Sequence, residues 1–175
     1  MKLIIPIEPK PQRRPRAGRR GNHATVYEDG KMVAWRKKCT EFVRQNYDGP
    51  YFDGAIKVDM TFYIPAPKSM SEPPKPRSKA KKVQQYDDFI NERIYVDKKP
   101  DLDNLEKAVY DSISKAGCVW TDDNIIVEHT TRKLYSPRPR IEIEVEEVEA
   151  LKGDGTYVLI RLIEEYNYQT EETDE

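Results

Sequence analysis

A short acidic run near the middle of the chain has the residue types and spacing that metal-dependent chemistry needs. The run reads Asp101-Leu102-Asp103-Asn104. If the chain enters it in extended form, the carboxylates of Asp101 and Asp103 point to the same side, about 7 Å apart along the backbone. Carboxylates so close repel each other unless a cation lies between them. Oxygen ligands without Cys or His favour Mg²⁺, with Mn²⁺ as a possible substitute, over zinc.

A second acidic pair, Asp122-Asp123, follows the helix predicted for residues 103–116. That helix is about 21 Å long, and residues 117–123 span at most about 25 Å. The second pair therefore reaches the first only if the intervening loop runs back along the helix. A partner chain is the other possible source of a third carboxylate. The candidate metal ligands are Asp101, Asp103, Asp122 and Asp123.

The predicted helix has two distinct faces. One face carries Asp103, Lys107 and Asp111 at intervals of four residues. Gly117 stands where a helix commonly ends. The other face is an apolar stripe formed by Leu105, Val109, Ile113 and Ala116.

Each polar feature also has a purely structural explanation. Asp103 followed by Glu106 resembles a capping box at a helix start. Lys107 is four residues from Asp103, as in a simple helical ion pair worth about 0.3–0.5 kcal/mol. Asp122-Asp123 is also typical of a turn. The occurrence of Lys107 and a second acidic pair together favours chemistry over capping.

Charge is distributed unevenly along the chain. Residues 1–44 contain twelve Lys and Arg against four Asp and Glu, whereas residues 141–175 contain two against twelve. A basic end favours binding to a polyanion such as a phosphate backbone, and a solvated charged surface is the alternative. Residues 9–20 are expected to form an exposed arm. The candidate DNA-binding residues are Arg13, Arg14, Arg16, Arg19 and Arg20 in this arm, with Lys37 and Lys38 on a helix predicted for 33–45.

The remaining pattern predicts an α+β fold, with a small mixed, largely antiparallel sheet and two main helices on one face. Residues 28–31 are expected to form a turn between two short extended pieces. A mobile insertion is expected at about 66–98, with one short helix near 84–90. The predicted strands are 3–7 at a sheet edge, 55–64, and two antiparallel neighbours at 124–133 and 139–147.

Composition limits the class of protein. A chain of 175 residues fits one domain, here 1–150, followed by an extension at 151–175 with an acidic, disordered tail. With 37% hydrophobic and 35% charged residues, the core is thin, which often accompanies a dimer. No apolar run is long enough to cross a bilayer, so a cytoplasmic protein is expected. The cysteines and histidines are scattered singly, which argues against disulfides and zinc.

The acidic runs together resemble the RusA family of Holliday-junction resolvases. The resemblance is strong over about residues 99–135 and weaker over the arm and the strand near 56–65. It is carried by Lys99-Pro100-Asp101-Leu102-Asp103-Asn104-Leu105, Lys107, Asp111, Gly117 and Asp122-Asp123-Asn124-Ile125-Ile126.

This resemblance implies a homodimeric, Mg²⁺-dependent endonuclease that hydrolyses phosphodiester bonds in four-way DNA junctions during recombination and repair. Carried over by position, the catalytic residues are Asp101, Asp103, Lys107 and Asp123, although the choice between Asp122 and Asp123 stays open. A metal-dependent glycosyltransferase is a rival that also uses Asp-x-Asp. It is disfavoured because the pattern shows no nucleotide-binding α/β sheet. A non-catalytic protein that binds branched DNA remains the alternative.

Overall fold

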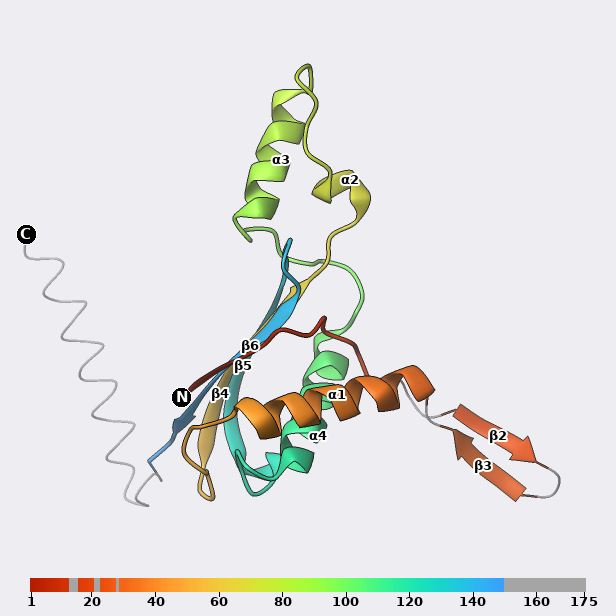
Figure 1. Ribbon diagram of the computed structural model, residues 1–175, viewed down its shortest axis with the longest axis vertical. Coiled ribbons are helices and arrows are strands. Elements are labelled where there is room, and N and C mark those ends of the chain that lie inside the picture. The colour runs from red at the N-terminus through yellow and green to blue at the C-terminus, as the bar shows by residue number, and fades with distance from the viewer. Residues whose placement is uncertain (13–15, 21–22, 28, 150–175) are drawn as a thin grey trace, which may run out of the picture.

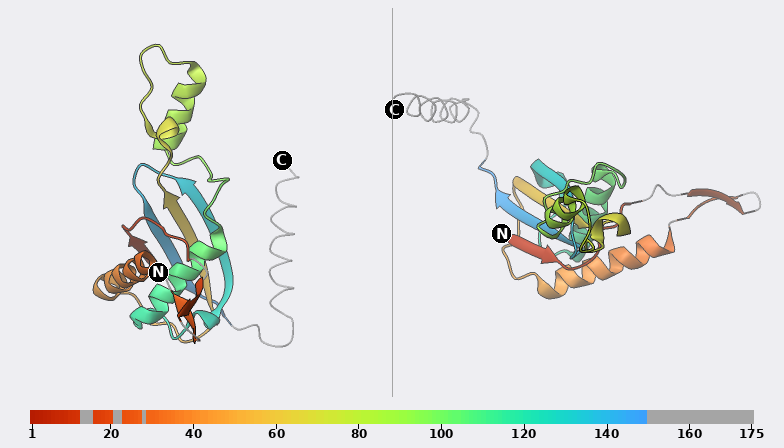
Figure 2. Two further views of the ribbon diagram at one scale, coloured as in Figure 1. Left: turned by 90° about the vertical axis from the view of Figure 1, so that its right-hand side faces the viewer. Right: turned by 90° about the horizontal axis from the view of Figure 1, so that it is seen from above.

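The computed structural model describes residues 1–12, 16–20, 23–27 and 29–149, with side chains for 1–12 and 29–149. Its main sheet contains β1 (Lys2–Ile5), β4 (Ile56–Ile64), β5 (Ile126–Tyr135) and β6 (Arg140–Glu147), in the order β1-β6-β4-β5 (Figure 1). Helices α1 (Gly30–Asn46) and α4 (Leu102–Ala116) lie on one face of this sheet (Figure 2). The predicted α+β fold with a mixed, mostly antiparallel sheet is confirmed.

β4 is one of the two inner strands of the sheet, and it has a regular apolar face. Its side chains alternate, with Ile56, Val58, Met60 and Phe62 fully buried under the helices. β6 pairs with one edge of β4 in antiparallel fashion, and β5 pairs with the other edge in parallel. The prediction that β5 and β6 are neighbours is therefore wrong. β4 lies between them, and the mostly exposed β5 takes a sheet edge, as β1 does.

The two long helices pack against each other as well as on the sheet. The apolar stripe of α4 is buried as predicted, with Leu105 and Val109 fully inaccessible. The Thr40 hydroxyl of α1 donates to the Ser112 carbonyl of α4 over 3.1 Å. Gly117 ends α4 in the left-handed conformation, with φ 70°.

The region before α1 differs from the sequence prediction. Asp29 is the N-cap of α1, and its side chain accepts a hydrogen bond from the Lys31 amide at 3.0 Å. The expected turn at residues 28–31 is therefore wrong, because Asp29 starts a helix instead of closing a hairpin. The expected arm is also more regular, since β2 (Arg16–Arg20) pairs with β3 (His23–Tyr27). This hairpin extends past the N-terminal end of α1 (Figure 1).

The insertion between β4 and α4 projects beyond one end of the sheet (Figures 1 and 2). It contains α2 (Lys68–Ser71) and α3 (Ala80–Ile90). The single predicted helix near 84–90 corresponds to α3, which begins four residues earlier, and α2 was not predicted. The mobility of the insertion remains a prediction.

An ion-pair network joins the base of the insertion to the sheet. The Arg140 guanidinium donates to both carboxylate oxygens of Glu92, over 2.7 and 2.9 Å, and lies 3.6 Å above the Tyr63 ring. The Ser136 hydroxyl also donates to Glu92. Hydrogen bonding to Arg140 lowers the pKa of Glu92 despite the opposing effect of burial. These contacts attach the segment that follows α3 to the sheet.

The second face of the sheet is not covered by α1 or α4 and carries charged side chains. Arg132 and Asp59 form a two-pronged ion pair with both distances at 2.7 Å, and Lys57 pairs with Glu128 at 3.2 Å. Lys2 bridges Glu142 and Glu144. Among the described residues, no helix has the length and apolar character needed to span a bilayer.

The alternation along β6 gives a direct test of this fold. Ile143 points into the core with 1% exposure, whereas the next residue, Glu144, lies on the charged face. Ile143→Ala should lower the free energy of unfolding by about 2–5 kcal/mol, because it leaves a cavity under α1 and α4. Glu144→Ala should cause a much smaller change. Urea unfolding measures both, and equal losses would contradict the assigned register.

Candidate active site

The first acidic run lies at the N-terminal end of α4. Asp101 is the N-cap residue, but its side chain makes no capping hydrogen bond, and Asp103 lies exposed in the first turn. No hydrogen bond or ion pair joins the Asp101 carboxylate to another described side chain. The capping-box explanation for Asp103 and Glu106 is therefore not realised. Both carboxylates are left available to a ligand.

Two long-range contacts hold this end of α4 in place. The Lys133 ammonium of β5 donates to the carbonyls of Lys98 and Pro100, both at 2.6 Å. The backbone N–H of Gln12 donates to the backbone carbonyl of Asn104 over 2.7 Å. The chain entering Asp101 is thus attached to the sheet, and the segment that leads into the arginine-rich hairpin starts beside Asn104.

The second acidic pair comes back to the middle of α4. Asp122 precedes the short helix η1 (Asp123–Ile125), and its carboxylate accepts a hydrogen bond from the Asp123 amide at 2.8 Å. Burial raises the pKa of Asp123, and the negative charges of Asp122 and Asp111 raise it further, while Lys107 opposes them. Residues of one chain therefore gather here, because the loop runs back along the helix.

Asp111 is a member of this cluster that the predicted site set omitted. Its carboxylate lies 3.9 Å from the Lys107 ammonium and 3.9 Å from the Arg36 guanidinium of α1. Lys107 thus pairs with Asp111 and not with Asp103. The four-residue spacing along the helix was the available signal for Asp111, but nothing in the sequence indicated that α1 would bring Arg36 to it.

A small pocket adjoins Asp123 on the β5 side. It has a volume of about 340 Å³, and its lining includes Tyr110, Asp123 and His129. His129 Nδ1 lies 3.4 Å from the Glu106 carboxylate and 3.5 Å from the Tyr110 hydroxyl. Burial raises the pKa of Tyr110, with smaller contributions from Glu106 and Asp123. Nothing in the sequence indicated that these residues meet, because His129 is an isolated histidine.

The donor atoms suit a hard cation. All four predicted ligands supply carboxylate oxygens, and burial together with the neighbouring charges of Asp122 and Asp111 raises the pKa of Asp123, which a bound cation would counter. In the described part of the chain, no three acidic, His or Cys side chains are already close enough together to enclose an ion. Asp101 and Asp103 are exposed, so their side chains can rotate on a backbone that Lys133 and Gln12 hold.

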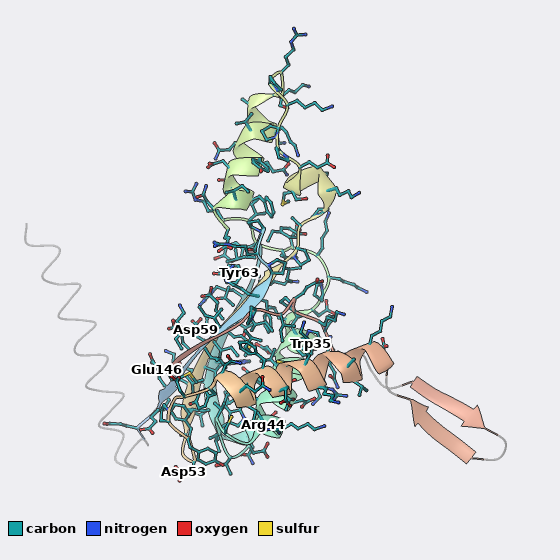
Figure 3. The ribbon with its side chains drawn as sticks, in the orientation of Figure 1. Trp35, Arg44, Asp53, Asp59, Tyr63 and Glu146 are labelled. Atoms are coloured by element: carbon teal, nitrogen blue, oxygen red, sulfur yellow. The ribbon has the colours of Figure 1, made fainter. Side chains whose placement is uncertain are left out.

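The predicted DNA-binding residues are placed only in part. Lys37 and Lys38 are exposed on α1 and border a groove of about 500 Å³ that also contains Ile7 and Phe42. In Figure 3, Trp35 and Arg44 mark the course of this helix. The side chains of the five candidate arginines, Arg13, Arg14, Arg16, Arg19 and Arg20, lie outside the described residues.

The raised pKa of Asp123 predicts a cost in stability. The folded state favours protonated Asp123, so its contribution to stability falls as pH rises from the ordinary value near 3.8 through the folded value. Asp123→Asn should therefore raise the melting temperature at pH 7 in metal-free buffer, and the gain should vanish below pH about 4. Asp53→Asn, at an exposed position (Figure 3) that is not among the charges acting on Asp123, should have no such effect. A pH-independent difference for Asp123→Asn would contradict this explanation.

Comparison with known proteins agrees with this arrangement. The model of the family described as endodeoxyribonuclease RusA matches residues 6–146, which include α1, β4, α4, β5 and all but the last residue of β6. The chain is 28% identical to the uncharacterized protein YqaN of Bacillus subtilis, over 86% of this chain and 98% of that protein. It is 24% identical to the crossover junction endodeoxyribonuclease RusA of Aquifex aeolicus, over 81% of this chain and 84% of that protein. With a match over most of its length, the chain belongs to the RusA endodeoxyribonuclease family.

Proposed function

We propose that this protein is a Mg²⁺-dependent endonuclease that cuts branched DNA, in particular four-way junctions, during recombination and repair. One observation carries the proposal: the loop after α4 brings Asp122 and Asp123 back to Lys107 and Asp111, on the same helix that begins at Asp101 and Asp103. Carboxylates and a lysine on one surface are suited to hydrolysing a phosphodiester. The Aquifex relative, a crossover junction endodeoxyribonuclease, supports the choice of substrate.

The acidic residues would have distinct roles. Asp101, Asp103 and Asp123 would hold Mg²⁺, with Asp122 as a further candidate ligand. Bound there, Mg²⁺ would polarise the phosphoryl oxygens and acidify a water molecule. Lys107 would stabilise negative charge on the phosphate during the reaction. Asp111 lies between Arg36 and the exposed Lys107, 3.9 Å from each, so it would keep the lysine ammonium beside the carboxylates.

The basic residues around this surface would hold the DNA. The arginine-rich segment starts next to the first turn of α4, because the Gln12 amide binds the Asn104 carbonyl. Arg13, Arg14, Arg16, Arg19 and Arg20 would therefore contact phosphates close to the cut, with Lys37 and Lys38 contacting them farther along α1. Such contacts position a duplex without reading its sequence. This agrees with a nuclease that selects structure.

Removing one carboxylate should separate cutting from binding. Asp103→Asn should lower junction cleavage in Mg²⁺ by at least about 100-fold, while binding stays equal or becomes tighter because phosphate repulsion falls. The assay is cleavage of a synthetic four-way junction, and chelator should abolish it for the wild type. Asp53→Asn is the matched control and should cut normally. If the wild-type protein binds junctions but never cuts them in Mg²⁺ or Mn²⁺, the chain is instead a non-catalytic protein that binds branched DNA.

We also propose that the protein acts as a homodimer. A four-way junction has paired strands of like polarity, so two coordinated cuts need two active sites related by symmetry. Light scattering at working concentration should give twice the chain mass of 20.5 kDa. A monomer that cuts both strands with full activity would contradict the proposal.

A further inference from the structure

The insertion carries the most concentrated positive charge among the side chains that the structure describes outside the site. Residues 68–82 contain six basic residues and one acidic residue, Glu72. Five of the six basic side chains are exposed, and the sixth, Lys82, donates to the Ser69 carbonyl and ties α3 to α2. The basic residues are Lys68, Lys75, Arg77, Lys79, Lys81 and Lys82.

This charge gathers at the tip of the insertion, which we call the basic tip and define as residues 75–81. α3 runs from the basic tip down to the sheet (Figure 1), and side chains that end in nitrogen project from its outer end (Figure 3). The base is fixed by Phe89, which is 3% exposed, and by the ion pair between Glu92 and Arg140. The basic tip is therefore held at a defined distance from the sheet.

Folding of α3 does not explain these charges. The N-terminal end of a helix carries a partial positive charge, which favours acidic residues there. α3 has Lys79 as its N-cap and Lys81 and Lys82 in its first turn, with no acidic residue in that turn. Asp87 and Asp88 lie at the opposite end, where basic residues would stabilise the helix. The arrangement costs helix stability, so a ligand for the positive end is the better explanation.

The basic tip lies on the side of the molecule where the acidic run begins. The segment after α3 leads directly to Asp101 and is held by Lys133 through the carbonyls of Lys98 and Pro100. In two views at right angles, the N-terminal end of α4 is the end nearer the insertion (Figures 1 and 2). With eleven residues, α3 is about 16 Å long. The base of α3 lies between the basic tip and the N-terminal end of α4 (Figures 1 and 2), so the tip is at least about half a turn of B-DNA from the acidic run.

We propose that the basic tip binds the phosphate backbone of one duplex arm, at least about half a helical turn from the cleavage position. This inference rests on the proposed nuclease function, because it takes the DNA to lie at Asp101 and Asp103. The tip contributes affinity and orientation only. It has no part in hydrolysis.

The test compares two triple variants that remove the same number of positive charges. Lys75→Ala, Lys79→Ala and Lys81→Ala are combined in the tip variant. The control combines Lys2→Ala, Lys57→Ala and Lys115→Ala. Lys2 and Lys57 form ion pairs on the open face of the sheet, and Lys115 lies in the last turn of α4. The tip variant should reduce the slope of log affinity against log salt by up to about 2.7, and the control should not. Its melting temperature should not fall, because the removed charges opposed the helix dipole.

Modified DNA then locates the contact. In one junction, uncharged methylphosphonates replace the phosphates about five to ten base pairs from the branch point in every arm, and in another they replace those beside it. The wild type should lose affinity for the first junction, while the tip variant should bind it as well as the unmodified one. Equal sensitivity of the two proteins, or equal slope changes in both triple variants, would overturn the proposal.

Cleavage at saturating protein should be unchanged in the tip variant. A tip-dependent slope without any cleavage by the wild type would support the tip and reject the nuclease function.

Discussion

The placement of Asp123 in a partly buried position beside other carboxylates is the constraint on which the rest of this site depends. Burial raises the pKa of Asp123, the neighbouring charges of Asp122 and Asp111 raise it further, and Lys107 opposes them. Such a cluster does not stabilise a fold. It persists because the buried stripe of α4, the core under β4 and the pairing of Arg36 with Asp111 together outweigh it. A stability cost concentrated at a functional site is a common compromise in enzymes.

The scaffold holds the cluster from three directions. α1 supplies Arg36, β5 supplies Lys133 behind the entry to Asp101, and the loop after α4 supplies Asp122 and Asp123. Each contact joins segments far apart in the sequence. The backbone at the first acidic run is therefore fixed, while the side chains of Asp101 and Asp103 remain exposed. A fixed backbone with accessible carboxylates is suitable for a ligand as large as a DNA junction.

The insertion shows the same separation between anchor and working surface. Its base is held by Phe89 and by the network of Glu92, Arg140 and Ser136, where hydrogen bonds between charged groups are partly shielded from water. Its outer end carries charges that oppose the dipole of α3. The contacts that stabilise the insertion therefore lie at its base beside the sheet, and its outer end is exposed to other molecules.

Local sequence determined the features that depend on neighbours along the chain. The alternation in β4, the apolar stripe of α4 and the stop at Gly117 are short-range patterns, and each was predicted correctly because burial and helix termination follow from spacing. The acidic run was recognisable for the same reason. The helix start at Asp29 was missed because Asp serves equally well in turns and at N-caps, and only the following residues of α1 decide between them.

Tertiary structure decided everything that depends on which strands and helices meet. The position of β4 between β5 and β6 follows from competition for the most apolar strand, which no single segment reveals. The pairing of Lys107 with Asp111, the approach of Arg36 and the contact of His129 with Glu106 likewise require α1, α4 and β5 to be packed. Spacing along one helix identifies which residues can share a face. It does not identify what faces them, because that partner comes from packing across the whole chain.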